Sequence, residues 1–191
     1  MERTDRDAAA SDGELMGRVR DGDLARLGEL FDRHARRLHH FFLRSTGDRA
    51  AAEDLVQEVF VRMLKYRATF REGAEFTPWM WALARHAAAD QWRARPREQA
   101  ADETTPEPAS PEPPPIAALV EREQLERLSA ALDRLPPAKR EVLVLARFTE
   151  LGYERIGELL GVSVGAVKVR VHRALKSLRS VYLAEAGEGV A

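Results

Sequence analysis

The stretch GELLGVSVGAVKVRVHRALKSLR, from Gly157 to Arg179, decides the fold of the C-terminal half of the chain. It begins as a short amphipathic helix, turns at Gly161, and continues as a longer helix that Ser163 can cap, which is the pattern of a helix-turn-helix. Apolar residues three and four positions apart predict the buried face of the longer helix. This face consists of Val164, Val167, Val171, Ala174 or Leu175, and Leu178.

The rest of the longer helix is basic, with five Lys or Arg and no acid from Ser163 to Ser180. Scattered cations usually form a solvated charged face, but the missing acids and the preceding turn favour DNA as the partner. In a helix-turn-helix, residues near the N-terminus of the second helix reach base edges, and flanking cations meet phosphates. The predicted DNA contacts are Ser163, Gly165, Ala166, Lys168, Arg170, Arg173 and Lys176.

Charge along the chain is uneven, although the formal net charge of the 191 residues is only −1. Lys and Arg outnumber Asp and Glu by 14 to 9 in residues 24–97 and by 12 to 10 in residues 118–191. Residues 98–117 hold five acids and no base. Two mildly basic blocks are therefore separated by an acidic segment, and a nucleic acid would meet the blocks rather than the total charge.

The acidic segment PREQAADETTPEPASPEPPPI, from Pro96 to Ile116, holds seven of the ten prolines. Such a composition excludes a helix or strand and favours an extended, solvated linker. We therefore expect two domains with short tails. The predicted boundaries are a disordered tail at 1–10, a first domain at 11–95, a linker at 96–116, a second domain at 117–183 and a tail at 184–191.

Both domains show helical periodicity without the period-two alternation of strands, so the predicted fold class is all-α, with two small helical domains joined by a Pro-rich acidic linker. The first is expected to be a bundle of about four helices. Its predicted N-caps are Ser11, Asp23, Asp48 and Thr77, and its predicted helix ends are Thr46, Arg67 and Arg93. The second is expected to begin near Ala117, to break at Leu135-Pro136-Pro137 and to continue through Phe148.

The absence of cysteine excludes a disulfide scaffold and a thiol nucleophile. The N-terminus MERTDRDAAASDGE has no apolar signal region, and no apolar run approaches the length of a membrane helix. The five His residues lack metal-ligand spacing. We expect a cytoplasmic protein without a membrane span, cofactor, metal or catalytic residue.

All three Trp lie in FTPWMWALARHAAADQWRARPR, Phe76 to Arg97, interleaved with Arg. One helical face carries Met80, Leu83, Ala84 and Ala87 and is expected to be core. A second face carries Trp81, Arg85, Ala88 and Trp92, an arrangement that suits stacking on unpaired bases and also suits packing. Of the three Trp residues, Trp79 is the expected core residue.

The preceding helix, AAEDLVQEVFVRMLKYR, has a polar side opposite its apolar stripe. Asp54, Glu58 and Arg62 are spaced at i, i+4 and i+8, with Gln57 beside them. A solvated face with a favourable Glu–Arg pair is the default interpretation.

Taken together and in this order, AEDLVQEVFVRML, the Trp/Arg helix, the variable linker and LDRLPPAKREVLVLARFTELGYERIGELLGVSVGAVKVRVHRALKSLR resemble the extracytoplasmic-function sigma factors of bacterial RNA polymerase. The resemblance implies that the first domain is sigma-2-like and binds the clamp of core polymerase and the −10 promoter element. It implies that the second is sigma-4-like and binds the −35 element through its helix-turn-helix.

The resemblance also assigns residues to these roles. Polymerase contact falls on Asp54, Gln57 and Glu58. The −10 contacts are Arg85, His86, Asp90, Trp92 and Arg93, to which the aromatic face adds Trp81. Two departures put base preference in question: LARH replaces the usual IARN at His86, and GAVKVRV lacks two hydroxyls at Ala166 and Val169.

The implied protein is a non-enzymatic specificity subunit that is monomeric when free. Its partners are core RNA polymerase and promoter DNA, with an anti-sigma factor as a further candidate. A stand-alone helix-turn-helix regulator is the alternative, and it would usually dimerise to span two half-sites. It would leave the AEDLVQEVF helix without a role.

Overall fold

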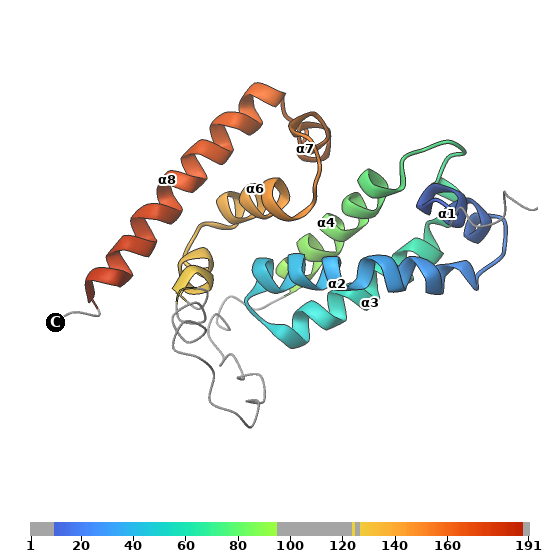
Figure 1. Ribbon diagram of the computed structural model, residues 1–191, viewed down its shortest axis with the longest axis horizontal. Coiled ribbons are helices and arrows are strands. Elements are labelled where there is room, and N and C mark those ends of the chain that lie inside the picture. Colours follow the sequence, from blue (N-terminus) through green and yellow to red (C-terminus); the bar gives the residue numbers. More distant parts are fainter. Residues whose placement is uncertain (1–9, 95–123, 125–126, 189–191) are drawn as a thin grey trace, which may run out of the picture.

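The structure is a computed structural model that describes residues 10–94, 124 and 127–188. These residues form helices joined by short turns, and no strand occurs among them (Figure 1). The prediction of an all-α fold is confirmed. None of the helices in these ranges is long and apolar enough to cross a bilayer. The expected linker, 96–116, lies outside the described residues.

The first domain consists of four α-helices and one short 3₁₀ turn. They are α1 (Asp12–Arg20), α2 (Arg26–Thr46), α3 (Arg49–Lys65), η1 (Arg67–Thr69) and α4 (Phe76–Ala94). Helix α2 packs against α1 and α3, and α3 packs against α4. The side chains that fill this core include Leu15, Met16, Leu30, Leu38, Phe42, Val59, Met63 and Met80, all fully buried.

Two of the predicted caps are confirmed. The Ser11 Oγ accepts from the Glu14 amide, and the Glu14 carboxylate accepts from the Ser11 amide, which completes a capping box. The Asp48 carboxylate accepts from the Ala51 amide at 3.0 Å. The predicted end at Thr46 is also confirmed, because Gly47 follows in the left-handed region with φ of 68°.

The other two caps were wrong. Helix α2 begins at Arg26 after a turn, and its N-cap is Ala25 rather than Asp23, whose carboxylate instead binds the Arg26 guanidinium at 3.0 Å. Helix α4 begins at Phe76, so Thr77 lies inside its first turn. Pro78 is tolerated there because the first amides of a helix have no partner within it. Helix α3 ends at Lys65, two residues before the predicted end, and η1 follows.

The prediction for the tryptophans was also wrong. Trp81 is fully buried and packs on Phe41, with ring centroids 4.8 Å apart, whereas Trp79 is only half-buried and donates to Thr69 Oγ1 at 3.3 Å. The periodicity placed Trp81 and Met80 on different faces of α4, but the helix is covered on both of these faces, and both residues are fully buried. A Trp between two packed layers belongs to the core.

The second domain consists of helical residues 127–133 followed by three helices: α6 (Pro137–Phe148), α7 (Tyr153–Leu160) and α8 (Val164–Glu188). Pro136 is the N-cap of α6, so the predicted break at the two prolines is confirmed. Helix α8 packs against α6 and α7. The core of this domain includes Leu132, Val142, Leu145, Ile156, Val167 and Ala174.

The two domains are in contact, because α2 and α6 pack against each other (Figure 1). Arg140 of α6 donates to the Ser45 carbonyl near the end of α2 at 3.0 Å and to the Leu132 carbonyl at 2.8 Å. Arg37 of α2 donates to the Thr149 carbonyl, just after the end of α6, at 2.6 Å. Each helix thus supplies an arginine to the unpaired carbonyls at the end of the other.

Burial affects the charged groups at this contact. Burial lowers the pKa of Arg140, against the opposing charge of Asp133, and burial raises the pKa of the Asp133 carboxyl. Because three backbone carbonyls accept from its guanidinium, Arg140 has the partners that a buried cation requires.

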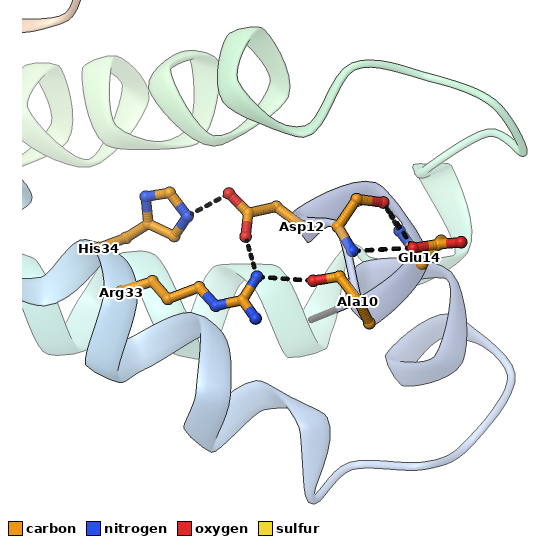
Figure 2. A network of polar contacts seen from close by, with 6 residues as sticks. Ala10, Asp12, Glu14, Arg33 and His34 are labelled. Atoms are coloured by element: carbon orange, nitrogen blue, oxygen red, sulfur yellow. Dashed lines mark hydrogen bonds and ion pairs between the residues drawn. The ribbon is translucent and has the colours of Figure 1, made fainter. Parts of the chain in front are cut away.

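Figure 2 shows how α1 is joined to α2. The Asp12 carboxylate accepts from Arg33 Nη1 at 2.8 Å and lies 2.7 Å from His34 Nε2. Arg33 Nη1 also donates to the Ala10 carbonyl at 2.8 Å. Burial raises the pKa of the Asp12 carboxyl, but the hydrogen bonds from Arg33 and His34 outweigh burial, so the net pKa lies below its usual value.

We therefore predict that Asp12→Asn reduces the dependence of stability on pH. A carboxyl whose pKa is lowered by folding adds stability above its unfolded-state pKa of about 3.9, and this stability is lost as the pH falls through the folded-state value. At pH 7 the variant should lose ~1 kcal/mol, since the pair is partly exposed. Urea unfolding from pH 3 to pH 7 measures both effects. Asp32→Asn, at an exposed position of α2, is the control, and an equal loss in both variants would contradict the prediction.

Candidate nucleic-acid interface

The helix-turn-helix of α7 and α8 is built as the sequence predicted. Gly161 follows α7 with φ of 65°, and the Val162 amide donates back to the Gly157 carbonyl at 2.9 Å. Ser163 Oγ accepts from the Ala166 amide at 3.2 Å, so Ser163 caps α8. The turn is tight enough that a Cβ atom on Gly157 would lie 2.7 Å from the Val162 carbonyl oxygen.

Helix α8 separates an apolar face from a basic one. Val167, Val171 and Ala174 are buried, and Leu175 is exposed, which settles the alternative between the last two in favour of Ala174. Of the predicted contact residues, Ala166 is half-buried and the others are exposed: Ser163, Gly165, Lys168, Arg170, Arg173 and Lys176. Within the described part of the chain, the four cations of this set make no ion pair. A contiguous positive face is therefore available to phosphates.

The predicted −10 residues of α4 are in different surroundings. His86 is exposed. Arg85 is half-buried and faces the second domain, where its Nε donates to Glu141 Oε1 at 2.8 Å and its Nη1 to the Leu159 carbonyl at 2.9 Å. Trp92 and Arg93 belong to the last turn of α4, but their side chains lie outside the described residues.

The prediction that Trp81 contacts DNA is corrected by its burial. With no exposed surface, the ring is not available to stack on a base, and it serves the core instead. Helical periodicity identified two faces of α4, but it did not show that the second domain and α2 cover part of the second face. Arg85 and Trp81 share this face, and both are used in packing or pairing.

The polar side of α3 is mostly open to solvent. Asp54 and Gln57 are exposed, while Glu58 is half-buried and pairs with Arg62 at 2.6 Å, as its i, i+4 spacing predicted. Sequence reasoning missed Val61, whose residue surface is 56% exposed. Val61 lies four positions after Gln57. The same i, i+4 spacing that linked Asp54 to Glu58 could therefore have placed Val61 on the polar side of the helix. Val61 gives this polar side an apolar centre.

Arg62 also reaches a residue of α4. Its Nη2 lies 2.9 Å from Asp90 Oδ2, while its Nε donates to Glu58. Burial lowers the pKa of Arg62, but the hydrogen bonds to Glu58 and Asp90 outweigh it and raise the net pKa. Glu58, a predicted polymerase contact, and Asp90, a predicted DNA contact, thus both bind the Arg62 guanidinium.

An exposed basic recognition helix in one helical domain, joined in the same chain to a second helical domain with an open polar helix, defines a multi-domain DNA-binding protein. Two family models match the chain: the sigma-70 region 2 model over residues 30–98 and the sigma-70 region 4 model over residues 125–178. They match the first and second domains in that order.

Similar proteins extend over most of the chain. The RNA polymerase sigma factor CarQ of Myxococcus xanthus is 36% identical over 168 residues, which covers 87% of this chain and 94% of that protein. The ECF RNA polymerase sigma factor SigF of Caulobacter vibrioides is 35% identical, with 86% and 89% covered. The structure of CnrH in complex with the cytosolic domain of CnrY matches with a TM-score of 0.68 at 26% identity, covering 91% of this chain and 97% of that one.

The chain therefore belongs to the extracytoplasmic-function (ECF) sigma factors of the sigma-70 family. It is a transcription initiation factor that binds core RNA polymerase and directs it to specific promoters.

We predict opposite effects of alanine at two glycines of the helix-turn-helix. Gly157→Ala should destabilise the second domain by ~1–3 kcal/mol, because the new Cβ meets a backbone oxygen at 2.7 Å. Gly165→Ala should stabilise it by up to ~1 kcal/mol, since the new Cβ meets only Ser163 Oγ, at 3.9 Å, and Ala favours the helix. Thermal unfolding followed by circular dichroism compares them, and equal shifts of the same sign would contradict the prediction.

Proposed function

We propose that the two domains hold two separate elements of one promoter, with the second domain on the −35 element and the first on the −10 element and on core polymerase. The observation that carries this proposal is the unpaired basic face of α8 together with the open polar side of α3. One surface suits duplex DNA and the other suits a protein, which a stand-alone DNA-binding regulator would not need. The proposed domain boundaries are those of the sequence, 11–95 and 117–183, joined by the acidic linker.

On the −35 side, the N-terminal part of α8 enters the major groove. Ser163, Gly165 and Ala166 lie at the tip, where small side chains permit a close approach to base edges. Lys168 and Arg170 follow within the next turn, and Arg173 and Lys176 extend the positive face to the flanking phosphates. The absence of hydroxyls at Ala166 and Val169 leaves base recognition to the longer cationic side chains.

On the −10 side, His86 and Asp90 are exposed on α4 and form the proposed contact surface with Trp92 and Arg93. Arg85 joins them when its pairing with Glu141 is exchanged for DNA. His86 stands where the family often has Asn, so it offers a ring nitrogen in place of an amide and is proposed to alter base preference.

On the polymerase side, Asp54, Gln57 and Glu58 present acceptors and one amide donor to the clamp. Val61, exposed among them, supplies an apolar contact of the kind found at the centre of protein interfaces. The chemistry of this surface is binding, and we propose that the protein is not an enzyme and acts in the cytoplasm as a monomer when free.

A protein regulator is a further proposed partner. The matched structure holds CnrH in complex with the cytosolic domain of CnrY. By analogy, we propose that this chain has an anti-sigma factor that competes with core polymerase.

We predict that Lys168→Ala and Arg170→Ala weaken binding to a −35 duplex. A residue that binds a base edge should cost ~1–3 kcal/mol and relax preference at one position, while a phosphate contact should lower the salt slope by about one. Fluorescence anisotropy at several salt concentrations separates the two cases. Arg147→Ala, an exposed position on α6 of the same domain, is the control. Unchanged affinity and salt slope in both test variants would remove these residues from the interface.

The promoter reading itself is tested by run-off transcription on genomic fragments. We expect core polymerase with the purified chain to initiate at specific promoters that core polymerase alone ignores, and sequencing of RNA 5′ ends identifies both elements. If the mapped start sites share only one conserved upstream element, the proposed division of the promoter between the two domains is wrong.

A further inference from the structure

Arg62 is the point at which the predicted polymerase side of α3 meets the predicted DNA side of α4. Its side chain is only 17% exposed, although both of its carboxylate partners are far more open. Nε binds Glu58 on its own helix and Nη2 binds Asp90 on the next one. The two contacts use different N–H groups of one planar guanidinium, so Arg62 can hold both carboxylates at once.

The two carboxylates differ in how their positions are fixed. Glu58 lies one turn before Arg62 on the same helix, so its pairing is local. Asp90 lies on α4, 28 positions further along the chain, and its side chain is 49% exposed. A half-exposed Asp near the end of a helix has several rotamers open to it. The contact with Arg62, at 2.9 Å, favours one of them and ties it to the orientation of α3.

We propose that Arg62 is a positioning residue that couples docking of α3 on core polymerase to the presentation of Asp90 at the −10 element. This inference rests on the proposed function, since it uses Glu58 as a polymerase contact and Asp90 as a DNA contact. When a hydrogen-bond donor on polymerase binds Glu58, the ion pair between Glu58 and Arg62 weakens. The guanidinium of Arg62 then interacts mainly with Asp90. The Arg62–Asp90 contact then strengthens, and Asp90 becomes more ordered in the bound state.

The coupling is reciprocal, because it is a free energy shared between two sites. If a −10 element favours this orientation of Asp90, its binding increases the affinity of the chain for polymerase. Polymerase binding increases the affinity of the chain for that element by the same factor. Lys at position 62 keeps the charge but offers one ammonium in place of the fork, so it holds one carboxylate well and the other poorly. Met keeps the aliphatic length and removes both contacts.

The test compares Arg62→Met, Arg62→Lys and a matched control in the reconstituted holoenzyme. The control is Arg49→Met, which removes a similar i, i+4 pair, Arg49–Glu53 at 3.2 Å, from the first turn of the same helix. Two quantities are measured: the Kd of the chain for core polymerase, and the rate of promoter opening at saturating holoenzyme on templates with single substitutions in the −10 element.

We expect Arg62→Met to lower promoter opening at saturation by at least about fivefold and to flatten discrimination among −10 variants by a similar factor. Arg62→Lys should keep part of the opening rate, and Arg49→Met should match the wild type. Asp90→Asn should have a clearly smaller effect beside Arg62→Met than in the wild-type background, because Arg62→Met has already broken the Arg62–Asp90 contact and only the direct role of Asp90 at the DNA remains to be lost.

Several results would overturn the inference. They are −10 discrimination that is unchanged in Arg62→Met, effects of Arg62→Met and Asp90→Asn that add fully, or an equal loss in Arg49→Met. If Arg62→Met does not fold, as judged by circular dichroism, a double-mutant cycle with Glu58→Gln and Asp90→Asn replaces it. The effects of these two changes on promoter opening must then be non-additive in the wild-type background. They must become additive in the Arg62→Lys background. A wild-type chain that fails to initiate with core polymerase overturns the proposed function, whereas normal initiation with uncoupled variants overturns this inference alone.

Discussion

The exchange of arginines between α2 and α6 is the contact on which the arrangement of the two domains depends. Each helix ends in carbonyls that have no partner within the helix, and burying such ends without partners would cost free energy. Arg140 binds the Ser45 carbonyl at the end of α2, and Arg37 binds the Thr149 carbonyl at the end of α6. Arg44 covers the Phe148 ring, with its guanidinium carbon 4.6 Å from the ring centroid. Both helices contribute arginines to this contact, and their acceptors are backbone carbonyls together with the carboxylates of Glu150 and Asp133.

The α2–α6 contact gathers several charged groups. Backbone carbonyls add no negative charge, but Arg37 also pairs with Glu150 Oε2 at 2.9 Å and Arg140 with Asp133 Oδ1 at 3.3 Å. The neighbouring cations Arg36 and Arg44 of α2 still give this region a positive field. The effect is visible at His40, where burial lowers the pKa of the imidazole and the charges of Arg36, His39 and Arg44 lower it further. Arg36 and His40 line a hollow of about 360 Å³ beside Phe148. Apolar packing, directional hydrogen bonds and the ion pairs Arg37–Glu150, Arg85–Glu141 and Arg155–Glu75 hold the domains together.

Most of the fold could be predicted from the sequence, because local signals dictated it. The capping box at Ser11, the left-handed Gly47 and the Gly161–Ser163 turn act within a few residues, and each was placed correctly. The two main errors had different causes, one local and one tertiary. Asp23 lost its capping role to a side-chain pair with Arg26, and Trp81 was buried by a neighbouring helix that periodicity cannot reveal. The same limit applies to the site: the basic face of α8 follows from its own helix, whereas the pairs Arg85–Glu141 and Arg62–Asp90 join residues distant in sequence.

These two long-range pairs place different demands on the proposed −10 surface. Arg85 donates from both Nε and Nη1 to the second domain, so a DNA phosphate must compete with Glu141 and with the Leu159 carbonyl for it. Asp90 is paired within the first domain, and its contact with Arg62 does not depend on how the domains lie. A sequence comparison would treat both as equivalent DNA residues of one helix. Their partners distinguish them: under the proposed function Arg85 reaches DNA at the expense of the domain contact, whereas the Arg62–Asp90 pair lies within the first domain and does not involve the second.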